Sequence, residues 1–594
     1  MKYRIMTISL IIAGFCAFVP PALAQNTTTP GQIATYSTIH SGGIEWPITG
    51  DDDHDATCTV SFRMQGETVW RQGLDSFRID YTPPEPVNGL SDPFNGFAGS
   101  LFDLNPATTY EIRLDLADPD GGSEIRTTTV TTRAIPEKPT GPTTFHVIPG
   151  SGDGTGTLAD PFQGIEAAQT HATPGAVFLL QAGTYQGFPP DGEIELNESG
   201  TPGQYVVWQA DGDGEVIFDD LVRVAADFVW LEGVHVRGHV DVADEFGLLT
   251  YDAPEDVVIT RNLFTDFHYS ITLNHGGSDW VITDNTIIGD KDVIGNPDDS
   301  TSWSGEGIEL EHTGGHTIAH NQISRVADGI SYPLSNTDIF GNEIFDVTDD
   351  GIEPDYSYAN IRIWGNRISN ARHNGVSFQP MNSGPWYIIR NQMVAGEGAL
   401  KLRESSRALI AHNIFVGWEG VQAYGSEWLL NFQSNNNLWI SVRDRYVWEN
   451  GEGGAASWRT NLDFDGFDWG DNIYAFKWGA NERYVDLAEF QAATGLEPNG
   501  IHINRNSCFQ TFDIPEAPPQ SMPFQHMTLK VGSAAIDAGT PLPNINDDFS
   551  GSAPDLGPFE KGRGLPWYGP RPEGMLFFDA FESADTGGWT HMVP

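Results

Sequence analysis

A short unit centred on asparagine recurs through the middle of this chain. It reads apolar, two variable residues, Asn, one variable residue and apolar, as in Ile259 to Phe264. Seven successive asparagines are spaced by 23, 36, 21, 24, 25 and 22 residues: Asn262, Asn285, Asn321, Asn342, Asn366, Asn391 and Asn413. A period of 21 to 25 residues that holds two or three short strands is typical of a solenoid of stacked parallel strands. We expect the Asn side chains to bond from turn to turn in a ladder.

The repeats and the segments around them resemble right-handed parallel β-helix proteins of the pectate-lyase-like kind. Before the repeats, the Gly-rich residues 149–154 run into Asp160, which resembles the N-cap of an entry helix. After the repeats, residues 535–539 and 554–560 resemble the closing motif of such proteins. The resemblance covers residues 144–562. It implies an all-β fold whose main part is a right-handed single-stranded parallel β-helix.

The residues outside the solenoid carry other patterns. Residues 33–135 alternate apolar and polar positions between turns, which predicts a small β-sandwich before the solenoid. Within them, residues 104–110 (LNPATTY) resemble the tyrosine corner of fibronectin type III modules. Residues 1–24 combine a basic start, an apolar run and a final Ala-Leu-Ala, so we expect a signal peptide and a secreted or periplasmic protein. We also expect an aromatic-rich insertion at 441–530 and a C-terminal tail at 563–594.

Charge narrows the choice of partners. The 594 residues include 31 Lys and Arg against 81 Asp and Glu, a formal net charge of -50. Such a charge repels phosphate backbones, so we expect no nucleic-acid partner. After the first 24 residues no apolar stretch is long enough to cross a bilayer, so we expect no membrane insertion. We expect a monomer. The acidic residues 51–55 are predicted to form a solvated loop.

One face of the predicted solenoid concentrates charged side chains. Alternate residues of each strand point outward, and equivalent positions stack about 4.8 Å apart from turn to turn. The first outward column is predicted to be Thr272, Glu309, Ser331, Glu353, Ser377, Lys401 and Gln422. The second is predicted to be Asn274, Glu311, Pro333, Asp355, Gln379, Arg403 and Tyr424. His275 and His312 are expected just beyond these columns, in the same register on neighbouring turns.

The resemblance implies a chemistry for this face. In pectate-lyase-like enzymes, carboxylates hold Ca²⁺ against a uronate while a Lys or Arg removes the C5 proton. That proton is not acidic until the substrate carboxylate is neutralised. Carried over to this chain, Lys401 would be the base and Arg403 would bind the carboxylate, with His312 as a further candidate. The implied Ca²⁺ ligands are Glu309, Glu311, Glu353 and Asp355.

The same columns also fit a glycoside hydrolase. Glu353 and Asp355 lie two residues apart on one strand, or about 6.6 Å. Glu309 and Glu353 lie two turns apart, or about 10 Å. Either pair approaches the roughly 6.5–9.5 Å separation of the two carboxyls in an inverting enzyme. Lys401 and Arg403 would then position the substrate.

Further residues are candidates for sugar contacts. Trp303 lies in the segment that causes the long spacing of 36 residues and is predicted to offer an aromatic platform. His275, Gln379 and Tyr424 are predicted to contact substrate. The sequence therefore predicts a secreted carbohydrate-active enzyme whose partner is a polysaccharide, with β-elimination of a uronic-acid polymer placed before hydrolysis. Epimerisation and a non-catalytic binding or adhesin-type β-helix stay open.

Overall fold

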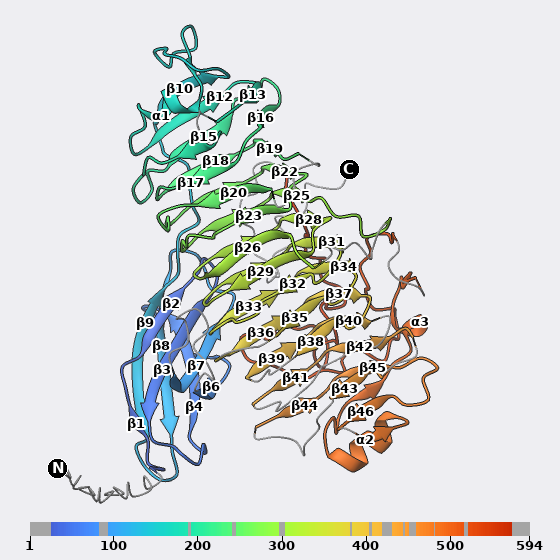
Figure 1. Ribbon diagram of the computed structural model, residues 1–594. Helices are drawn as coiled ribbons and strands as arrows, with labels where there is room; N and C mark the ends of the chain where they lie inside the picture. Colours follow the sequence, from blue (N-terminus) through green and yellow to red (C-terminus); the bar gives the residue numbers. More distant parts are fainter. Residues whose placement is uncertain are drawn as a thin grey trace, which may run out of the picture.

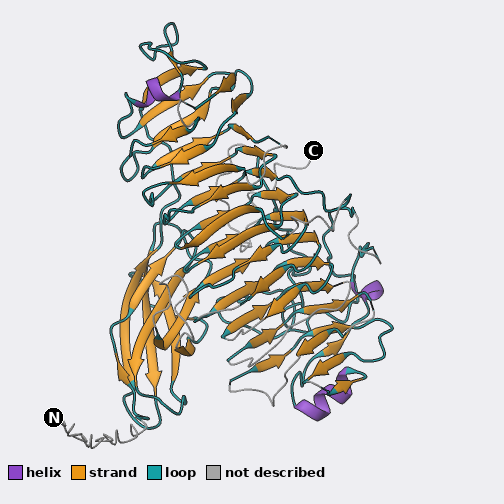
Figure 2. Ribbon diagram, viewed as in Figure 1, coloured by secondary structure: helices purple, strands orange, loops and turns teal. Residues whose placement is uncertain are grey.

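The computed structural model is an all-β molecule in which a small sandwich leans against a long solenoid of parallel strands (Figures 1 and 2). The structure describes residues 25–81, 93–187, 192–239, 245–295, 303–379, 383–402, 407–417, 431–443, 446–450, 459–479, 481–515 and 521–572. The expected signal peptide lies outside these residues. Among the described residues, no helix is both long and apolar enough to span a membrane.

Three parallel sheets run the length of the solenoid, and each turn contributes one strand to each sheet. The fourteen-stranded sheet contains, in spatial order, β11 (Phe162–Gln163), β10 (Thr143–Ile148), β12 (Ala176–Leu180), β15 (Val206–Ala210), β18 (Val229–Glu232), β21 (Val258–Thr260), β24 (Val281–Thr283), β27 (Thr317–Ala319), β30 (Asp338–Phe340), β33 (Ile361–Trp364), β36 (Trp386–Ile389), β39 (Ala408–Ala411), β41 (Gln433–Asn435) and β44 (Asn461–Asp463). The thirteen-stranded sheet contains β13 (Gly183–Tyr185), β16 (Val216–Phe218), β19 (His235–Arg237), β22 (Leu263–Thr265), β25 (Thr286–Ile288), β28 (Gln322–Ser324), β31 (Glu343–Val347), β34 (Arg367–Ala371), β37 (Gln392–Ala395), β40 (Ile414–Gly417), β42 (Leu438–Ser441), β45 (Gly466–Asp468) and β48 (Ile501–His502). The nine-stranded sheet contains β14 (Ile194–Leu196), β17 (Val222–Val224), β20 (Phe246–Thr250), β23 (Tyr269–Thr272), β26 (Glu306–Thr313), β29 (Asp328–Pro333), β32 (Ile352–Glu353), β35 (Val376–Phe378) and β38 (Leu400–Leu402).

Stacked identical side chains hold the turns in register. In the fourteen-stranded sheet, one isoleucine from each of seven consecutive strands pairs with the next and is fully or almost fully buried: Ile259, Ile282, Ile318, Ile339, Ile363, Ile388 and Ile410. Burying one such side chain stabilises a fold by about 1.5–3 kcal/mol. The repeat therefore forms a continuous apolar core along the axis.

The expected asparagine ladder is confirmed. Each Asn from Asn262 to Asn413 donates its side-chain N–H to the side-chain oxygen of the next, over 2.9–3.1 Å. The ladder continues through Asn437 and ends on the Asp465 carboxylate, which accepts from Asn437 over 3.1 Å. The long spacing before Asn321 leaves the ladder intact because the added residues lie outside the strands.

The sandwich pairs two antiparallel sheets. One contains β1 (Thr29–Pro30), β3 (Gly42–Thr49), β7 (Phe94–Leu101) and β6 (Phe77–Tyr81), with β2 (Ala34–Ser37) against β3. The other contains β5 (Arg71–Gln72), β4 (Thr57–Met64), β8 (Thr109–Ala117) and β9 (Glu124–Thr131). Tyr110 is buried, and its hydroxyl accepts a hydrogen bond from the Asn105 N–H over 2.8 Å.

The outer face of the fourteen-stranded sheet is covered by this sandwich from β27 to β39. Phe77 and Phe102 of the sandwich pack with Trp364 and Tyr387 of the solenoid in one buried apolar cluster. Beside them, the buried Arg362 guanidinium forms an ion pair with Asp338, which also accepts a hydrogen bond from Thr38 of the sandwich. We call this surface the covered face.

Three expectations on the ends of the solenoid need correction. Asp160 is not a helix N-cap, because Phe162–Gln163 extend the sheet and the chain turns only at Gly164 (φ 96°), where α1 (Ile165–Gln169) begins. Residues 441–530 are not simply an insertion, because β44, β45 and β48 continue the solenoid. The additions are α2 (Leu487–Thr494), α3 (Arg505–Cys508) and a sheet of β43 (Trp448–Asn450), β46 (Phe476–Trp478) and β47 (Arg483–Tyr484).

The described part of the C-terminal tail is a strap along the solenoid. Gly569 donates its N–H to the Gly341 carbonyl over 2.9 Å. Arg571 is buried and holds the Asp284 carboxylate through its backbone N–H and its guanidinium, over 2.8 and 2.6 Å. The strap therefore ties residues far along the chain to turns in the middle of the solenoid.

Candidate active site

The first outward column lies on the nine-stranded sheet as the sequence predicts. Thr272 pairs with Glu309, Glu309 with Ser331, and Ser331 with Glu353 on consecutive strands. Further along, Ser377 pairs with Lys401. Two carboxylates and one ammonium group therefore share one line of positions across β26 to β38. Gln422 lies outside the described residues.

The second column departs from the prediction in β26. The register shifts between Glu309 and Thr313, so that Thr313 rather than Glu311 lies opposite Pro333. Glu311 has a φ of 44° and an exposed side chain. A bulge in β26 therefore removes Glu311 from the column and from a ligand set shared with Asp355. The His312 side chain, Arg403 and Tyr424 lie outside the described part of the structure.

A second line of acids, which the columns missed, runs along the edge where the strands of this sheet begin. Glu306 pairs with Asp328 at the starts of β26 and β29. The Asp328 carboxylate accepts the Asp350 N–H over 2.9 Å, and the Asp350 carboxylate accepts the Asn374 N–H over 2.8 Å. Each carboxylate thus hydrogen-bonds the backbone of the next turn, which fixes its position.

Three of these carboxyls converge. Oxygens of Asp328, Asp349 and Asp350 lie within 4.8 Å of one another, and both Asp328 and Asp350 are almost fully buried. We call these three residues the triad. A sequence signal for two of them exists, because Asp328 and Asp350 each directly precede the Gly that marks the start of a strand. The search for outward positions began after that Gly and so passed over them.

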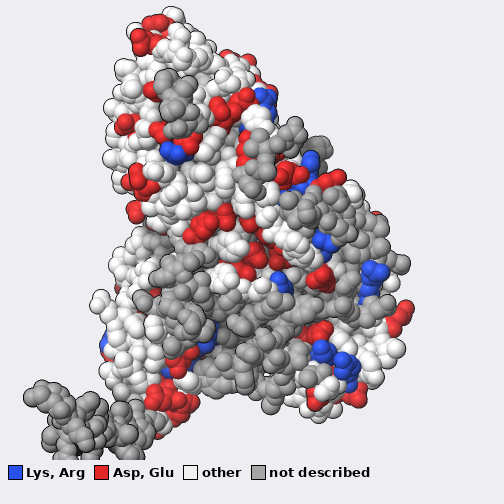
Figure 3. Space-filling model, in the orientation of Figure 1, with Lys and Arg blue, Asp and Glu red and all other residues white. Residues whose placement is uncertain are grey.

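The triad and its neighbours form a carboxyl-rich surface that we call the acidic face: Glu306, Glu309, Asp328, Asp349, Asp350, Glu353 and Asp355. Figure 3 shows Asp and Glu gathered over the middle of the molecule, around β26, β29 and β32. Burial, and then the charge of neighbouring carboxylates, raises the pKa values of these groups. The pKa rises to about 7 for Glu309 and Glu353, about 8 for Glu306, and about 9 for Asp349 and Asp355. Several of these carboxyls therefore hold a proton at neutral pH.

Lys401 brings a positive charge to the acidic face. Its Nζ lies 4.0 Å from Asp350 Oδ2, and its side chain is largely buried. Burial raises the pKa of Asp350, and the Lys401 ammonium opposes that rise. At the other end of the face, the Lys291 ammonium acts in the same sense on the pKa of Glu306, against the larger effect of burial. The face therefore combines carboxyls with different tendencies to ionise.

The other predicted contact residues are divided between this site and its surroundings. Gln379 donates its backbone N–H to Asp355 over 2.5 Å, so it belongs to the acidic face. Trp303 is 59% exposed and stacks on His373, with 4.2 Å between ring centroids. His275 instead bonds Thr250 and contacts the Tyr251 ring, one turn before β26. His373, which the sequence analysis did not select, is the aromatic partner at the site.

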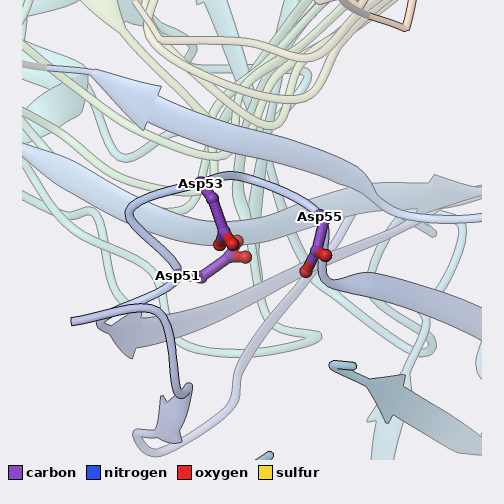
Figure 4. A group of neighbouring side chains, drawn as sticks. All are labelled: Asp51, Asp53 and Asp55. Carbon is purple, nitrogen blue, oxygen red and sulfur yellow. The ribbon is translucent and has the colours of Figure 1, made fainter. Parts of the chain in front are cut away.

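A separate group of three carboxyls lies in the sandwich (Figure 4). Oxygens of Asp51, Asp53 and Asp55 lie within 4.8 Å of one another. The loop is not wholly solvated as predicted, because Asp51 is fully buried and pairs with the buried Arg78 guanidinium. Asp51 also accepts the Ala56 N–H over 3.0 Å. These contacts give Asp51 a structural role in closing the loop between β3 and β4.

The fold and the acidic face together define a right-handed parallel β-helix protein with a carboxyl-rich site on one outer sheet. A family model described as "Right handed beta helix region" matches residues 246–415 and 306–465. The whole acidic face lies within the first of these matches. Comparisons with curated proteins and with solved structures give no match.

Proposed function

We propose that this chain is an exported carbohydrate-active enzyme that hydrolyses glycosidic bonds of an extracellular polysaccharide at the acidic face. The observation that carries the proposal is the triad, in which Asp328, Asp349 and Asp350 place oxygens within 4.8 Å of one another. A β-helix is compatible with carbohydrate-active and with adhesin-type roles. Clustered buried carboxyls with displaced pKa values favour an enzyme, because they are costly to keep in a surface that only binds.

Hydrolysis requires one protonated carboxylic acid and one ionised carboxylate beside the same bond. Burial, Asp350 and Glu353 raise the pKa of Asp349 to about 9, so Asp349 holds a proton at neutral pH. Asp350 lies beside the Lys401 ammonium, which favours its ionised form. We therefore assign Asp349 as the acid that protonates the leaving oxygen and Asp350 as the carboxylate that acts on the sugar carbon.

The spacing within the triad bears on the stereochemistry. Oxygens within 4.8 Å are closer to the roughly 5–5.5 Å separation of retaining enzymes than to the roughly 6.5–9.5 Å of inverting ones. We therefore expect retention, with Asp350 as a nucleophile. This differs from the inverting pair that the sequence suggested for Glu353 and Asp355.

Elimination from a uronic-acid polymer is the second candidate, and one observation favours it. Ca²⁺ binds oxygens at about 2.3–2.6 Å, so the triad's spacing of up to 4.8 Å fits around one ion. Asp350 Oδ2 is buried without a hydrogen bond, as a metal ligand would be. Asp328, Asp349 and Asp350 would hold the ion, which supplies positive charge against a substrate carboxylate. Lys401 would be the base.

Hydrolysis comes first because of Lys401. In the structure its ammonium forms an ion pair with Asp350. An ammonium group has no free electron pair, so it cannot remove a proton while that ion pair persists. As a substrate-binding group and a partner of Asp350, Lys401 needs no change of state.

Three further proposals concern the rest of the chain. We propose that residues 1–24 direct export, in keeping with their sequence pattern. The bond between Asn105 and the Tyr110 hydroxyl supports a fibronectin type III-like sandwich. The pectate-lyase-like character of the solenoid and a monomeric state stay proposals as well.

One digestion panel tests the function. Purified protein is incubated with neutral and acidic polysaccharides, with calcium or with a chelator, and products are followed by reducing ends and by the ultraviolet absorbance of unsaturated uronates. Reducing ends without absorbance, lost in Asp349→Asn, support hydrolysis. New absorbance that requires calcium establishes elimination instead. Retention of an intact polysaccharide with no product on any substrate supports the adhesin-type role.

A further inference from the structure

An exposed tryptophan lies beside the triad, and its position is fixed at both ends. Trp303 stacks on the His373 ring with an interplanar angle of 34°. His373 donates its backbone N–H to the Asp349 carbonyl over 3.1 Å, so it occupies the turn directly after the triad residue. Trp303 remains 59% exposed although one face rests on His373. Its other face is therefore open to solvent next to Asp349.

The His373 ring is itself held rigidly. Its Nδ1 lies 3.2 Å from a Glu397 oxygen, and its Nε2 lies 3.3 Å from an Arg372 nitrogen. These two contacts are satisfied together when Nδ1 carries the hydrogen and donates to Glu397 while Nε2 accepts from Arg372. The ring thus forms a fixed support for Trp303.

The chain next to Trp303 is held by a buried histidine. His268 Nε2 lies 3.2 Å from the Ser304 hydroxyl, and His268 Nδ1 lies 3.2 Å from an Asp290 oxygen. The following residue, Gly305, has a φ of 109°, and a Cβ there would come within 2.8 Å of the His268 carbonyl. Its carbonyl accepts the Ala327 N–H over 2.7 Å. Residues 303–305 therefore form a wall that runs along the edge on which the triad lies.

We propose that the open face of Trp303 binds a neutral sugar ring of the substrate beside the triad, and that His268 is a positioning residue for this wall. Aromatic faces carry partial negative charge and attract the C–H groups of a sugar ring. The surrounding carboxyls of the acidic face repel a second anion, which favours a neutral sugar over a uronate at this position. This inference rests on the proposed hydrolysis and specifies the substrate class of that site.

The test measures binding apart from catalysis. The Asp349→Asn variant is run in native gels containing xylan, a β-glucan, polygalacturonate or alginate, and retardation gives a dissociation constant for each. Adding Trp303→Ala is expected to weaken binding to a neutral polysaccharide about tenfold, the effect of losing about 1.4 kcal/mol of stacking. Trp567→Ala is the matched control, because Trp567 is also exposed (41%) but lies on the C-terminal strap. It is expected to change nothing.

The positioning role has its own readout. Ser304→Ala and His268→Gln are each expected to weaken binding by less than Trp303→Ala, and to add nothing when Trp303 is already Ala, because they act through that ring. In the otherwise unaltered enzyme, Trp303→Ala is expected to raise KM about tenfold with little change in kcat.

The outcomes separate the two proposals. If Trp303→Ala leaves binding and KM unchanged while hydrolysis still requires Asp349, the wall is not a sugar site. Retardation by polygalacturonate or alginate alone would overturn the neutral class. If retardation by a neutral polysaccharide depends on Trp303 but no product ever forms, the wall is a sugar site and the proposed hydrolysis fails. An effect of His268→Gln that persists without Trp303 would reduce His268 to a purely structural residue.

Discussion

The covered face and the acidic face are built from the same repeat, yet they treat buried charge in opposite ways. On the covered face, the buried Asp338 has the buried Arg362 as its ion-pair partner. On the acidic face, carboxyls outnumber the ammonium groups of Lys401 and Lys291. A buried ion pair is tolerated because each charge satisfies the other, whereas a surplus of like charges is unfavourable for folding. The comparison therefore locates function where the fold leaves charge uncompensated.

The two faces should respond in opposite ways to the loss of one carboxylate. On the covered face, removal leaves a buried guanidinium without its partner and destabilises the fold. On the acidic face, removal relieves repulsion and stabilises the fold while it impairs chemistry. The following predictions test this contrast, from the largest effect to the smallest.

Asp349→Asn should abolish most of the activity without weakening the fold. Loss of a general acid lowers kcat by about 10²–10⁴-fold. The same change removes one of the crowded carboxyls, so the melting temperature should stay level or rise. Initial rates and thermal unfolding measure both effects. Asp153→Asn, at an exposed carboxylate away from this face, is the control for a general effect of charge. A large fall in melting temperature together with the rate would place Asp349 among structural residues.

Asp338→Ala should be among the most destabilising single changes. It removes the ion-pair partner of Arg362, whose side chain is fully buried. Removing one partner of a buried pair costs about 3–5 kcal/mol. Denaturant unfolding of the variant measures the loss. The double variant Asp338→Ala, Arg362→Met should recover part of it, because no uncompensated charge then remains. A loss below about 1 kcal/mol would show that the covered face opens easily to water.

Stability should fall as the pH rises from 5 to 9. The pKa of Glu306 is raised to about 8 and that of Asp349 to about 9, above their unfolded values of about 4. The stability they contribute is fully present below about pH 4 and is lost as the pH rises through 8 to 9. Each such group changes the free energy of unfolding by at most about 1.4 kcal/mol per pH unit. Glu306→Gln should reduce the slope. A flat or rising profile from pH 5 to 9 would contradict the buried, crowded state of these carboxyls.

Arg133→Ala should have the smallest effect. Arg133 joins the sandwich to Asp256 and Asp279 at the edge of the interface, and its side chain is 24% exposed. Partly exposed ion pairs contribute about 1 kcal/mol or less. Unfolding at low and high salt should therefore differ less in the variant than in the parent. A loss as large as that of Asp338→Ala would mean that the edge, rather than the buried part, holds the sandwich in place.

The sequence allowed the solenoid and the first column to be predicted because both depend on periodicity. The Asn repeat sets the turns, and the Gly positions set the strand starts, so the pairing of Glu309 with Ser331 and Glu353 follows from counting. The bulge at Glu311 breaks that count and leaves no mark in the repeat. The stacking of Trp303 on His373 joins segments whose approach depends on the path of a loop. Periodicity carries no information on either.

The strap has a consequence for how the chain is made. Arg571 and its partner Asp284 are separated by 287 residues. At a synthesis rate of about 5–20 residues per second, Arg571 follows Asp284 by on the order of 15–60 s. During this interval the middle turns exist without the contact that ties them to the strap. Completion of this bond therefore marks a late step of maturation, after which turns made at different times are joined in one cooperative unit.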